Sequence, residues 1–260
     1  MNLKFVQVDA FADRPFTGNP AAVVPLDEWL PEEVMQAIAE ENNLSETAFT
    51  VPASDDADYE LRWFTPTTEV ALCGHATLAS GHVLIAAGAV RFRTRKAGVL
   101  VVRRDGEALT LDLPVTLVRE AEDQRLLDVL GTLAGRVFHS YAGAEATAIV
   151  LLEDEAAVRA CAPEMRRLRD IDLMAIVTAS GGDTDVVSRV FVPAWGVDED
   201  PVTGSAHAAL APFWADRLGR DRFTAFQASR RGGHVECRLA GDRAILGGRC
   251  VTVIEGTLKL

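Results

Sequence analysis

The sequence predicts a mixed α and β protein made of two similar halves, and three observations support this fold class. Strand-like and helical segments alternate along the chain, with no low-complexity linker between them. Two segments, CGHA at residues 73–76 and TGSA at 203–206, each open an alanine-rich helix, and their glycines are half the chain length apart (204 − 74 = 130). The 260 residues, 48% of them hydrophobic, suffice for two domains of ordinary size.

The first half begins and ends with strands and contains two helices. A helix is expected from Pro31 to the Asn42-Asn43 pair, because proline suits the first helical position and Glu32 and Glu33 suit the first turn. A second helix at 76–87 is apolar nearly all round, which indicates burial. Strands are predicted at 4–11, 21–25, 44–51, 59–64, 90–95, 99–103 and 109–113.

The second half repeats this plan. Strands are predicted at 136–141, 146–152, 173–179, 186–191, 225–227, 234–239 and 249–255, with a helix at 155–161. A loop at 195–203 leads into a helix that begins at Gly204, where Pro212 is expected to cause a kink or to mark the end of the first turns. We therefore expect domains at 1–116 and 117–260, with a last strand that can return to the first domain.

Charge and cysteine content exclude several classes of function. The net charge of −12 gives no positive field for nucleic acid or an anionic membrane. The most apolar window, 78–90, is too short and too often interrupted to span a bilayer. The four cysteines form no CxxC pair, so we expect reduced thiols and a cytoplasmic location rather than a zinc ribbon or a disulfide scaffold: Cys73, Cys161, Cys237 and Cys250.

The two glycine-containing helix starts could bind an anion. The first turn of a helix presents free N–H groups and the positive end of the helix dipole, and glycine permits close approach. His75 accompanies the first start, and Asp198, Glu199, Asp200 and Ser205 accompany the second. Gly74 and Gly204 could instead only permit tight turns between strand and helix.

Glu46 is a second candidate for chemistry. It lies on the strand predicted at 44–51 among apolar neighbours, where desolvation would raise its proton affinity toward that of a general acid or base. The pattern alone also fits a solvated strand carboxylate. His75 and His82 are seven residues apart on one helix, about 10.5 Å along its axis, so they cannot bind one metal ion together.

Five segments resemble the phenazine-biosynthesis PhzF-like family and extend over the whole chain. They are residues 5–24 (FVQVDAFADRPFTGNPAAVV), 42–49 (NNLSETAF), 72–78 (LCGHATL), 200–207 (DPVTGSAH) and 247–257 (GGRCVTVIEGT). The resemblance implies an α+β, diaminopimelate epimerase-like fold. In that fold two pseudo-symmetric domains each wrap a curved sheet around a central helix, and the active site lies between them.

The resemblance also implies roles for particular residues. It makes Glu46 the acid and base, with His75 and Asp200 as further catalytic residues. The implied substrate contacts are Asn19, Ser45, Gly74, Gly204 and Ser205. It implies a homodimer and a small carboxylate substrate, with neither metal nor cofactor, as in the proton shift of dihydro-3-hydroxyanthranilate.

Two other functions stay open at this point. Related folds racemise amino acids with a pair of cysteines; here Cys73 occupies the first such position but Thr203 the second, and threonine cannot serve as a thiol base. Cys73 could be only a buried filler. A non-catalytic protein that binds a small carboxylate is the remaining alternative, and the motifs do not define the substrate or establish a part in phenazine synthesis.

Overall fold

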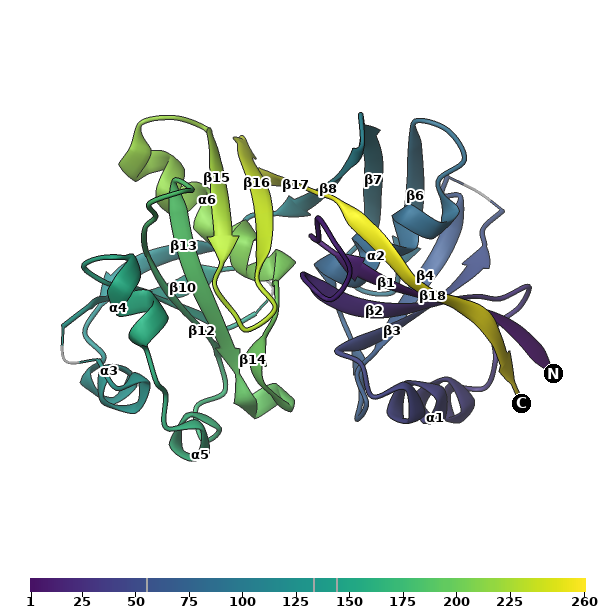
Figure 1. The fold of residues 1–260 in the computed structure, drawn as a ribbon, viewed down its shortest axis with the longest axis horizontal. Coiled ribbons are helices and arrows are strands. Elements are labelled where there is room, and N and C mark those ends of the chain that lie inside the picture. The colour runs from purple at the N-terminus through teal and green to yellow at the C-terminus, as the bar shows by residue number, and fades with distance from the viewer. Residues whose placement is uncertain (55, 133, 144) are drawn as a thin grey trace. The chain divides into compact units, whose positions relative to one another are not determined.

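The computed structural model describes residues 1–260 except 55, 133 and 144 (Figure 1). The chain forms two compact units, one of residues 1–112 with 247–260 and the other of residues 113–246. The last strand therefore belongs with the first unit. Among the described residues, no helix has both the length and the apolar character needed to cross a membrane.

The first unit is a mixed sheet with the strand order β18-β1-β2-β3-β4-β6-β7-β8. A two-residue strand, β5 (Glu69–Val70), pairs with β4 as well. The other strands are β1 (Asn2–Ala10), β2 (Asn19–Pro25), β3 (Glu46–Pro52), β4 (Tyr59–Phe64), β6 (Ala89–Thr94), β7 (Val99–Asp105), β8 (Ala108–Pro114) and β18 (Cys250–Lys259).

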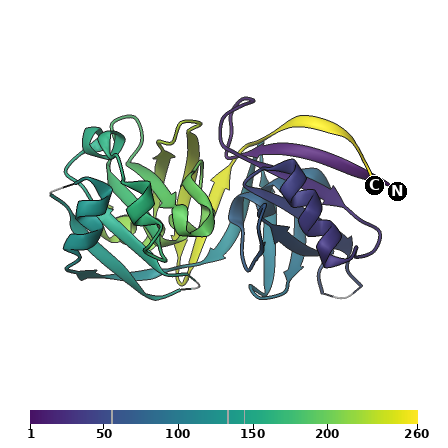
Figure 2. The same ribbon diagram turned by 90° about the horizontal axis from the view of Figure 1, so that it is seen from below.

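Two helices cover opposite faces of this sheet. Helix α1 (Glu32–Asn42) packs Met35 and Ile38 against Val24 and Phe49, and Figure 2 shows it lying along the outside of the unit. Helix α2 (Gly74–Leu84) contacts β1, β2, β3 and β7 and is buried from residue 74 to 81. Both faces of β2 are covered, which explains why residues 21–24 (AAVV) are all inaccessible to solvent instead of alternating.

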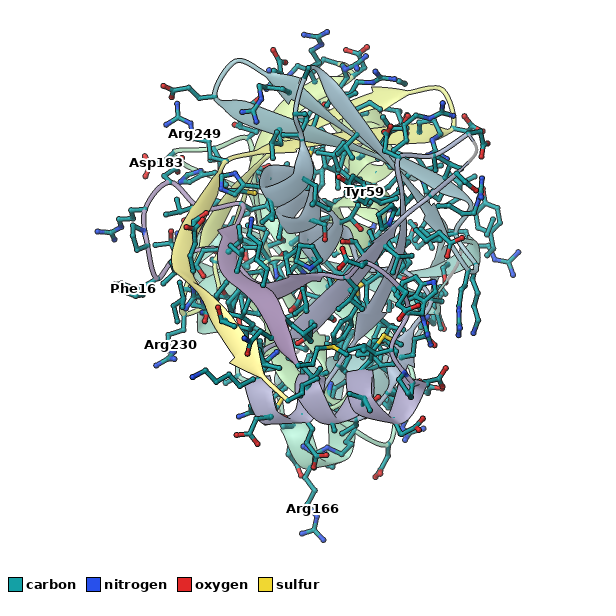
Figure 3. The ribbon with its side chains drawn as sticks, turned by 90° about the vertical axis from the view of Figure 1, so that its right-hand side faces the viewer. Phe16, Tyr59, Arg166, Asp183, Arg230 and Arg249 are labelled. Carbon is teal, nitrogen blue, oxygen red and sulfur yellow. The ribbon has the colours of Figure 1, made fainter. Side chains whose placement is uncertain are left out.

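The loop between β1 and β2 has a conformation that requires glycine at one position. Gly18 has φ +65°, and a Cβ there would lie 2.2 Å from the carbonyl oxygen of Ala10. The buried carboxylate of Asp9 accepts the N–H of Phe16 at 2.7 Å, while the Phe16 ring points outward (Figure 3). The loop thereby returns the chain to the sheet at Asn19, the first residue of β2.

The second unit has the strand order β9-β10-β11-β12-β13-β15-β16. Its strands are β9 (Leu117–Ala121), β10 (Arg136–Ala142), β11 (Thr147–Leu151), β12 (Met174–Ser180), β13 (Val186–Val192), β14 (Val197–Asp200), β15 (Arg222–Gln227), β16 (Gly233–Ala240) and β17 (Arg243–Gly248). From β10 to β16 the successive pairs are antiparallel, parallel, antiparallel, parallel and antiparallel. The first unit has the same series from β1 to β7.

The buried helix of the second unit is α6 (Gly204–Leu218), the counterpart of α2. It continues past Pro212, so the prediction that its first turns end there is wrong. Proline has no N–H, and it therefore leaves the carbonyl of Ala208 without its partner in the helix. The N–H of Thr116 donates to that carbonyl at 3.3 Å and restores the bond from outside the helix.

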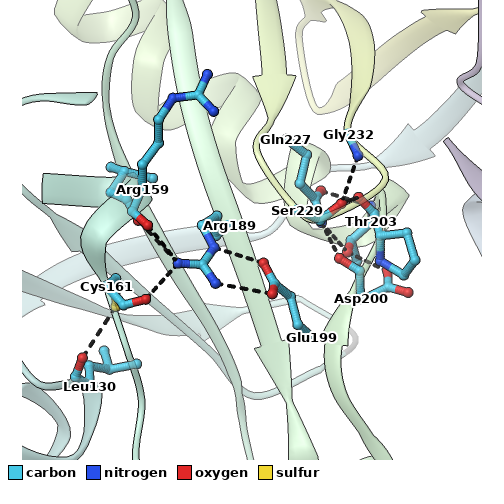
Figure 4. Close-up of polar contacts among 12 residues, drawn as sticks. Leu130, Arg159, Cys161, Arg189, Glu199, Asp200, Thr203, Gln227, Ser229 and Gly232 are labelled. Carbon is cyan, nitrogen blue, oxygen red and sulfur yellow. Dashed lines mark hydrogen bonds and ion pairs between the residues drawn. The ribbon is translucent and has the colours of Figure 1, made fainter. Parts of the chain in front are cut away.

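Three short helices complete the second unit: α3 (Gln124–Leu130), α4 (Glu155–Ala160) and α5 (Met165–Leu168). The segment 195–203, predicted as a loop, begins at the last residue of a 3-10 turn (Pro193–Trp195) and contains β14. Arg189 fixes this region from β13. Its guanidinium forms a two-point ion pair with Glu199 and donates to the carbonyls of Arg159 and Cys161 at the end of α4 (Figure 4).

Candidate active site

In the first unit, four chemically active side chains meet where two strands and a helix begin. Asn19 is the first residue of β2, Glu46 the first of β3 and His75 the second of α2, while Cys73 is the N-cap of α2. Strands β2 and β3 are parallel neighbours, with Ala21 opposite Glu46, so both start at the same edge of the sheet. Parallel pairing and the buried helix thus bring together residues that are up to 56 positions apart.

The imidazole of His75 is the centre of this cluster. Its Nε2 lies 3.0 Å from Oε2 of Glu46, and its Nδ1 lies 3.1 Å from Nδ2 of Asn19 and 3.6 Å from Sγ of Cys73. Asn19 is inaccessible to solvent and His75 and Cys73 are nearly so, whereas the Glu46 side chain is 17% exposed. Oε2 of Glu46 is itself buried and makes no hydrogen bond of regular geometry, so its approach to Nε2 is close but poorly aligned.

The neighbours of His75 favour one tautomer. The side-chain amide of Asn19 is a donor at Nδ2, whereas the sulfur of Cys73 can either donate or accept weakly. The Asn19 contact therefore favours Nδ1 as the acceptor, and a neutral ring then carries its proton on Nε2. That N–H lies on the side of the ring next to Glu46.

The second unit has a different set of groups at the start of α6. Gln227, on β15, accepts the N–H of Thr203 at 2.9 Å and donates to the carbonyl of Asp200 at 2.7 Å (Figure 4). The hydroxyl of Thr203 donates to the carboxylate of Asp200. Gln227 was not among the residues predicted from the sequence, because nothing in residues 222–227 indicates a contact 24 positions away.

The helix starts in the two units share a feature that suits an anion. Cys73 and Thr203 both have extended backbones at the N-cap, and neither side chain caps its helix. Neither N-cap side chain therefore accepts a first-turn N–H of its helix. Each start offers backbone donors and a positive dipole end to a carboxylate.

Ser205 and Met174 occupy the positions that correspond to His75 and Glu46. Ser205 is the second residue of α6 and Met174 the first of β12, and the Ser205 hydroxyl lies 3.8 Å from the Met174 sulfur. The second residue of the buried helix thus carries an imidazole in the first unit and a hydroxyl in the second. The first residue of the corresponding strand carries a carboxylate in the first unit and a thioether in the second. Ser45, half-buried, lies in the turn just before Glu46.

Several titratable residues near the second helix start have structural partners. Asp198 forms an exposed ion pair with Arg169, and Glu199 pairs with Arg189. His207 is inaccessible to solvent and donates from Nδ1 to the carbonyl of Thr203 at 2.8 Å. Burial lowers the pKa of His207 to about 4, so this imidazole is neutral near pH 7.

Comparison with known proteins gives consistent results. The family described as phenazine biosynthesis-like protein (PhzC-PhzF) matches residues 8–256. An uncharacterised isomerase of Pseudomonas aeruginosa is 49% identical, with all of both chains covered. The crystal structure of a PhzF family protein from Enterococcus faecalis has a TM-score of 0.91 and 42% identity over the whole of both chains.

A more distant structure supports the fold class. A hydroxyproline epimerase from Agrobacterium vitis has a TM-score of 0.63 at 14% identity, over 99% of this chain and 92% of its own. The fold is therefore the α+β fold of the PhzF proteins and the related epimerases, as predicted. By its sequence match and its structure, the chain belongs to the phenazine biosynthesis-like PhzC-PhzF family.

Proposed function

We propose that this protein is an isomerase that moves a proton between carbon atoms of a small carboxylic acid, with Glu46 as general acid and base. The observation that carries the proposal is the contact between Glu46 and His75, 3.0 Å apart in a nearly buried site where Asn19 holds the ring. Two Pseudomonas aeruginosa relatives named as isomerases, 49% and 48% identical over the whole chain, support the reaction class.

The chemistry follows from the groups present. The first turn of α2 offers N–H groups to the substrate carboxylate, which places a neighbouring carbon near Glu46. The carboxylate of Glu46, 3.0 Å from Nε2 of His75, takes the proton from carbon. Glu46 then returns the proton at another carbon of the conjugated system, while the backbone donors stabilise the negative charge that develops in between.

Asp200 and Ser205 are included in the proposal as partners in the same reaction. The Asp200 carboxylate accepts the hydroxyl of Thr203, and its main-chain carbonyl accepts the amide of Gln227. Ser205 lies at the start of α6. The Asp200→Asn variant is therefore expected to lower the rate as well. An unchanged rate would mean that Asp200 takes no part in the reaction, and it would not contradict the role of Glu46.

The test is carbon-bound deuterium in heavy water. Small carboxylic acids, with dihydro-3-hydroxyanthranilate among them, are incubated with the protein and analysed by mass spectrometry and NMR. The wild type should incorporate deuterium into a true substrate, and Glu46→Gln should lower the rate about 10²- to 10⁴-fold or more, because amide nitrogen cannot accept the proton.

The matched control is Glu40→Gln, which changes an exposed glutamate of α1 and should leave the rate unchanged. Exchange that persists in Glu46→Gln would remove Glu46 as the base. Acids that bind to the wild type without any exchange would favour a carboxylate-binding protein instead. A thiol-pair racemase is disfavoured because the hydroxyl of Thr203 is directed to Asp200.

The remaining expectations of the family resemblance stay predictions. Activity after treatment with EDTA tests the expected independence from metal, and sedimentation tests the expected homodimer.

A further inference from the structure

We propose that Glu46, Cys73 and His75 form a binding site for Zn²⁺. Each of the three offers one ligand atom, and these atoms all lie within 4.8 Å of one another. The ligands come from the start of β3, the N-cap of α2 and the first turn of α2. No metal-binding motif in the sequence predicts such a site, because those motifs depend on closely spaced ligands and Glu46 is 27 positions from Cys73 (73 − 46 = 27).

The donor set matches the preference of zinc. Thiolate sulfur, imidazole nitrogen and carboxylate oxygen are its three usual protein ligands, at about 2.3, 2.0 and 2.1 Å. In a tetrahedral site such atoms lie roughly 3.3–3.8 Å apart. Sγ of Cys73 and Nδ1 of His75 are already 3.6 Å apart, so these two need little movement.

The tautomer of His75 points to the nitrogen that would bind. With the proton on Nε2, the lone pair of the ring is on Nδ1, on the side of Cys73. Zinc at Nδ1 would displace the amide of Asn19. Because Oε2 of Glu46 lies 3.0 Å from Nε2, the Glu46 side chain would also have to rotate to bring a carboxylate oxygen to the ion. Three protein ligands leave the fourth position of the ion open.

Such an ion would inhibit the reaction. Zinc would hold the carboxylate of Glu46 as a ligand, so that group could no longer take a proton from carbon. This consequence rests on the proposed function, whereas zinc binding itself does not.

Cobalt provides the test, because Co²⁺ substitutes for Zn²⁺ and gives a thiolate-to-metal absorption band in the near ultraviolet. Co²⁺ added to EDTA-treated, desalted protein should produce the band, and one equivalent of Zn²⁺ should abolish it. Cys73→Ser should lack the band. The matched control Cys250→Ser, which changes the most exposed of the other three cysteines, should retain the band and the wild-type activity.

Zinc affinity, measured by competition with a chromogenic chelator, extends the test. Glu46→Gln and His75→Gln should each weaken binding at least about tenfold, because each removes a ligand. Asp200→Asn should leave zinc affinity unchanged. This variant therefore tests the two proposals separately. An Asp200→Asn variant that is inactive but still binds zinc supports both of them.

A second measurement covers the case in which Cys73→Ser does not fold. Zn²⁺ should slow the alkylation of Cys73 by iodoacetamide in the wild type, as followed by mass spectrometry, without changing that of Cys250. The proposal is overturned if the wild type gives no cobalt band, if folded Cys73→Ser gives the same band, or if Zn²⁺ does not protect Cys73.

Discussion

We expect Asn19 to determine which nitrogen of His75 carries the proton, because its amide donates toward Nδ1. Asn19→Asp replaces a donor at Nδ1 with an acceptor of nearly the same shape, so the proton moves to Nδ1 and Glu46 faces a lone pair. Deuterium exchange should fall by about 10² or more, as expected when a catalytic histidine is held in the wrong tautomer. Nitrogen NMR of the ring measures the tautomer directly.

Two outcomes of the Asn19→Asp experiment carry information. A changed tautomer with an unchanged rate would show that the proton on Nε2 is not needed. An unchanged tautomer would contradict the positioning role of Asn19. Asn19→Ala, which only removes the donor, is the matched variant and should reduce the rate less.

His207 should make the fold sensitive to acid. Its pKa is about 4 in the folded protein, where it is buried, against about 6.5 when unfolded. Below pH 6.5 the unfolded chain therefore binds a proton that the folded chain does not. The free energy of unfolding should decrease from pH 6.5 to pH 4, by about 3 kcal/mol in total from this group.

Urea unfolding at pH 7, 5.5 and 4 measures this effect. In His207→Asn the side-chain amide can still donate to the carbonyl of Thr203, but the titration is gone. Between pH 6.5 and 4, the free energy of unfolding of the variant should change less steeply with pH than that of the wild type. The difference should correspond to about one fewer proton taken up on unfolding. An identical pH dependence in both proteins would mean that His207 does not contribute.

At the level of single residues, the sequence identified candidate side chains but not the contacts that they make. Pattern reasoning left Glu46 open as a solvated carboxylate, and only the resemblance to a family gave it a role. The contact of Cys73 with His75 and the part of Gln227 in holding Asp200 were not foreseen, because packing between distant segments creates both. Asp198 and Glu199, equal candidates by sequence, are used in ion pairs with arginines.

Among the elements, α2 depends on a close approach to the sheet. A Cβ at Gly81 would lie 2.5 Å from Cγ1 of Val102 on β7. Gly81→Ala should therefore lower the free energy of unfolding, since an overpacking cost of about 1–3 kcal/mol exceeds the gain of about 1 kcal/mol in helix propensity. Urea unfolding provides the measurement.

The double variant Gly81→Ala, Val102→Ala tests the cause. If the two side chains collide, removal of the Val102 methyl groups should make Gly81→Ala neutral or stabilising in that background. Equal losses from Gly81→Ala in both backgrounds would place the strain elsewhere.

The long elements could be predicted because their sequence patterns are strong. The predicted strand 59–64 has the observed bounds, and the helix predicted from Pro31 is observed from Glu32 to Asn42. The elements that were missed are short or irregular: α3, α5, β5, β9, β14 and β17. A two- or four-residue strand such as β5 or β14 exists because a neighbour pairs with it, and local sequence contains little of that information.

At the scale of the whole molecule, two short similar segments predicted that the chain has two similar halves. The CGHA and TGSA segments share only a glycine and an alanine, yet the units that contain them have the same series of strand directions. Shared topology was predictable because a buried helix needs the same kind of sheet around it in both cases. The bounds of the two units depend on where the last strand pairs, which is a contact between the two ends of the chain.

The contact between Ser205 and Met174 bears on stereochemistry. A racemase with matched bases on its two halves takes a proton from one side of a carbon and supplies another from the opposite side. Here the position that carries Glu46 in one half carries a thioether in the other, and a thioether neither donates nor accepts a proton in such a reaction. If Glu46 takes the proton as proposed, we expect the same group to return it, so the product should keep one handedness and some of the original hydrogen.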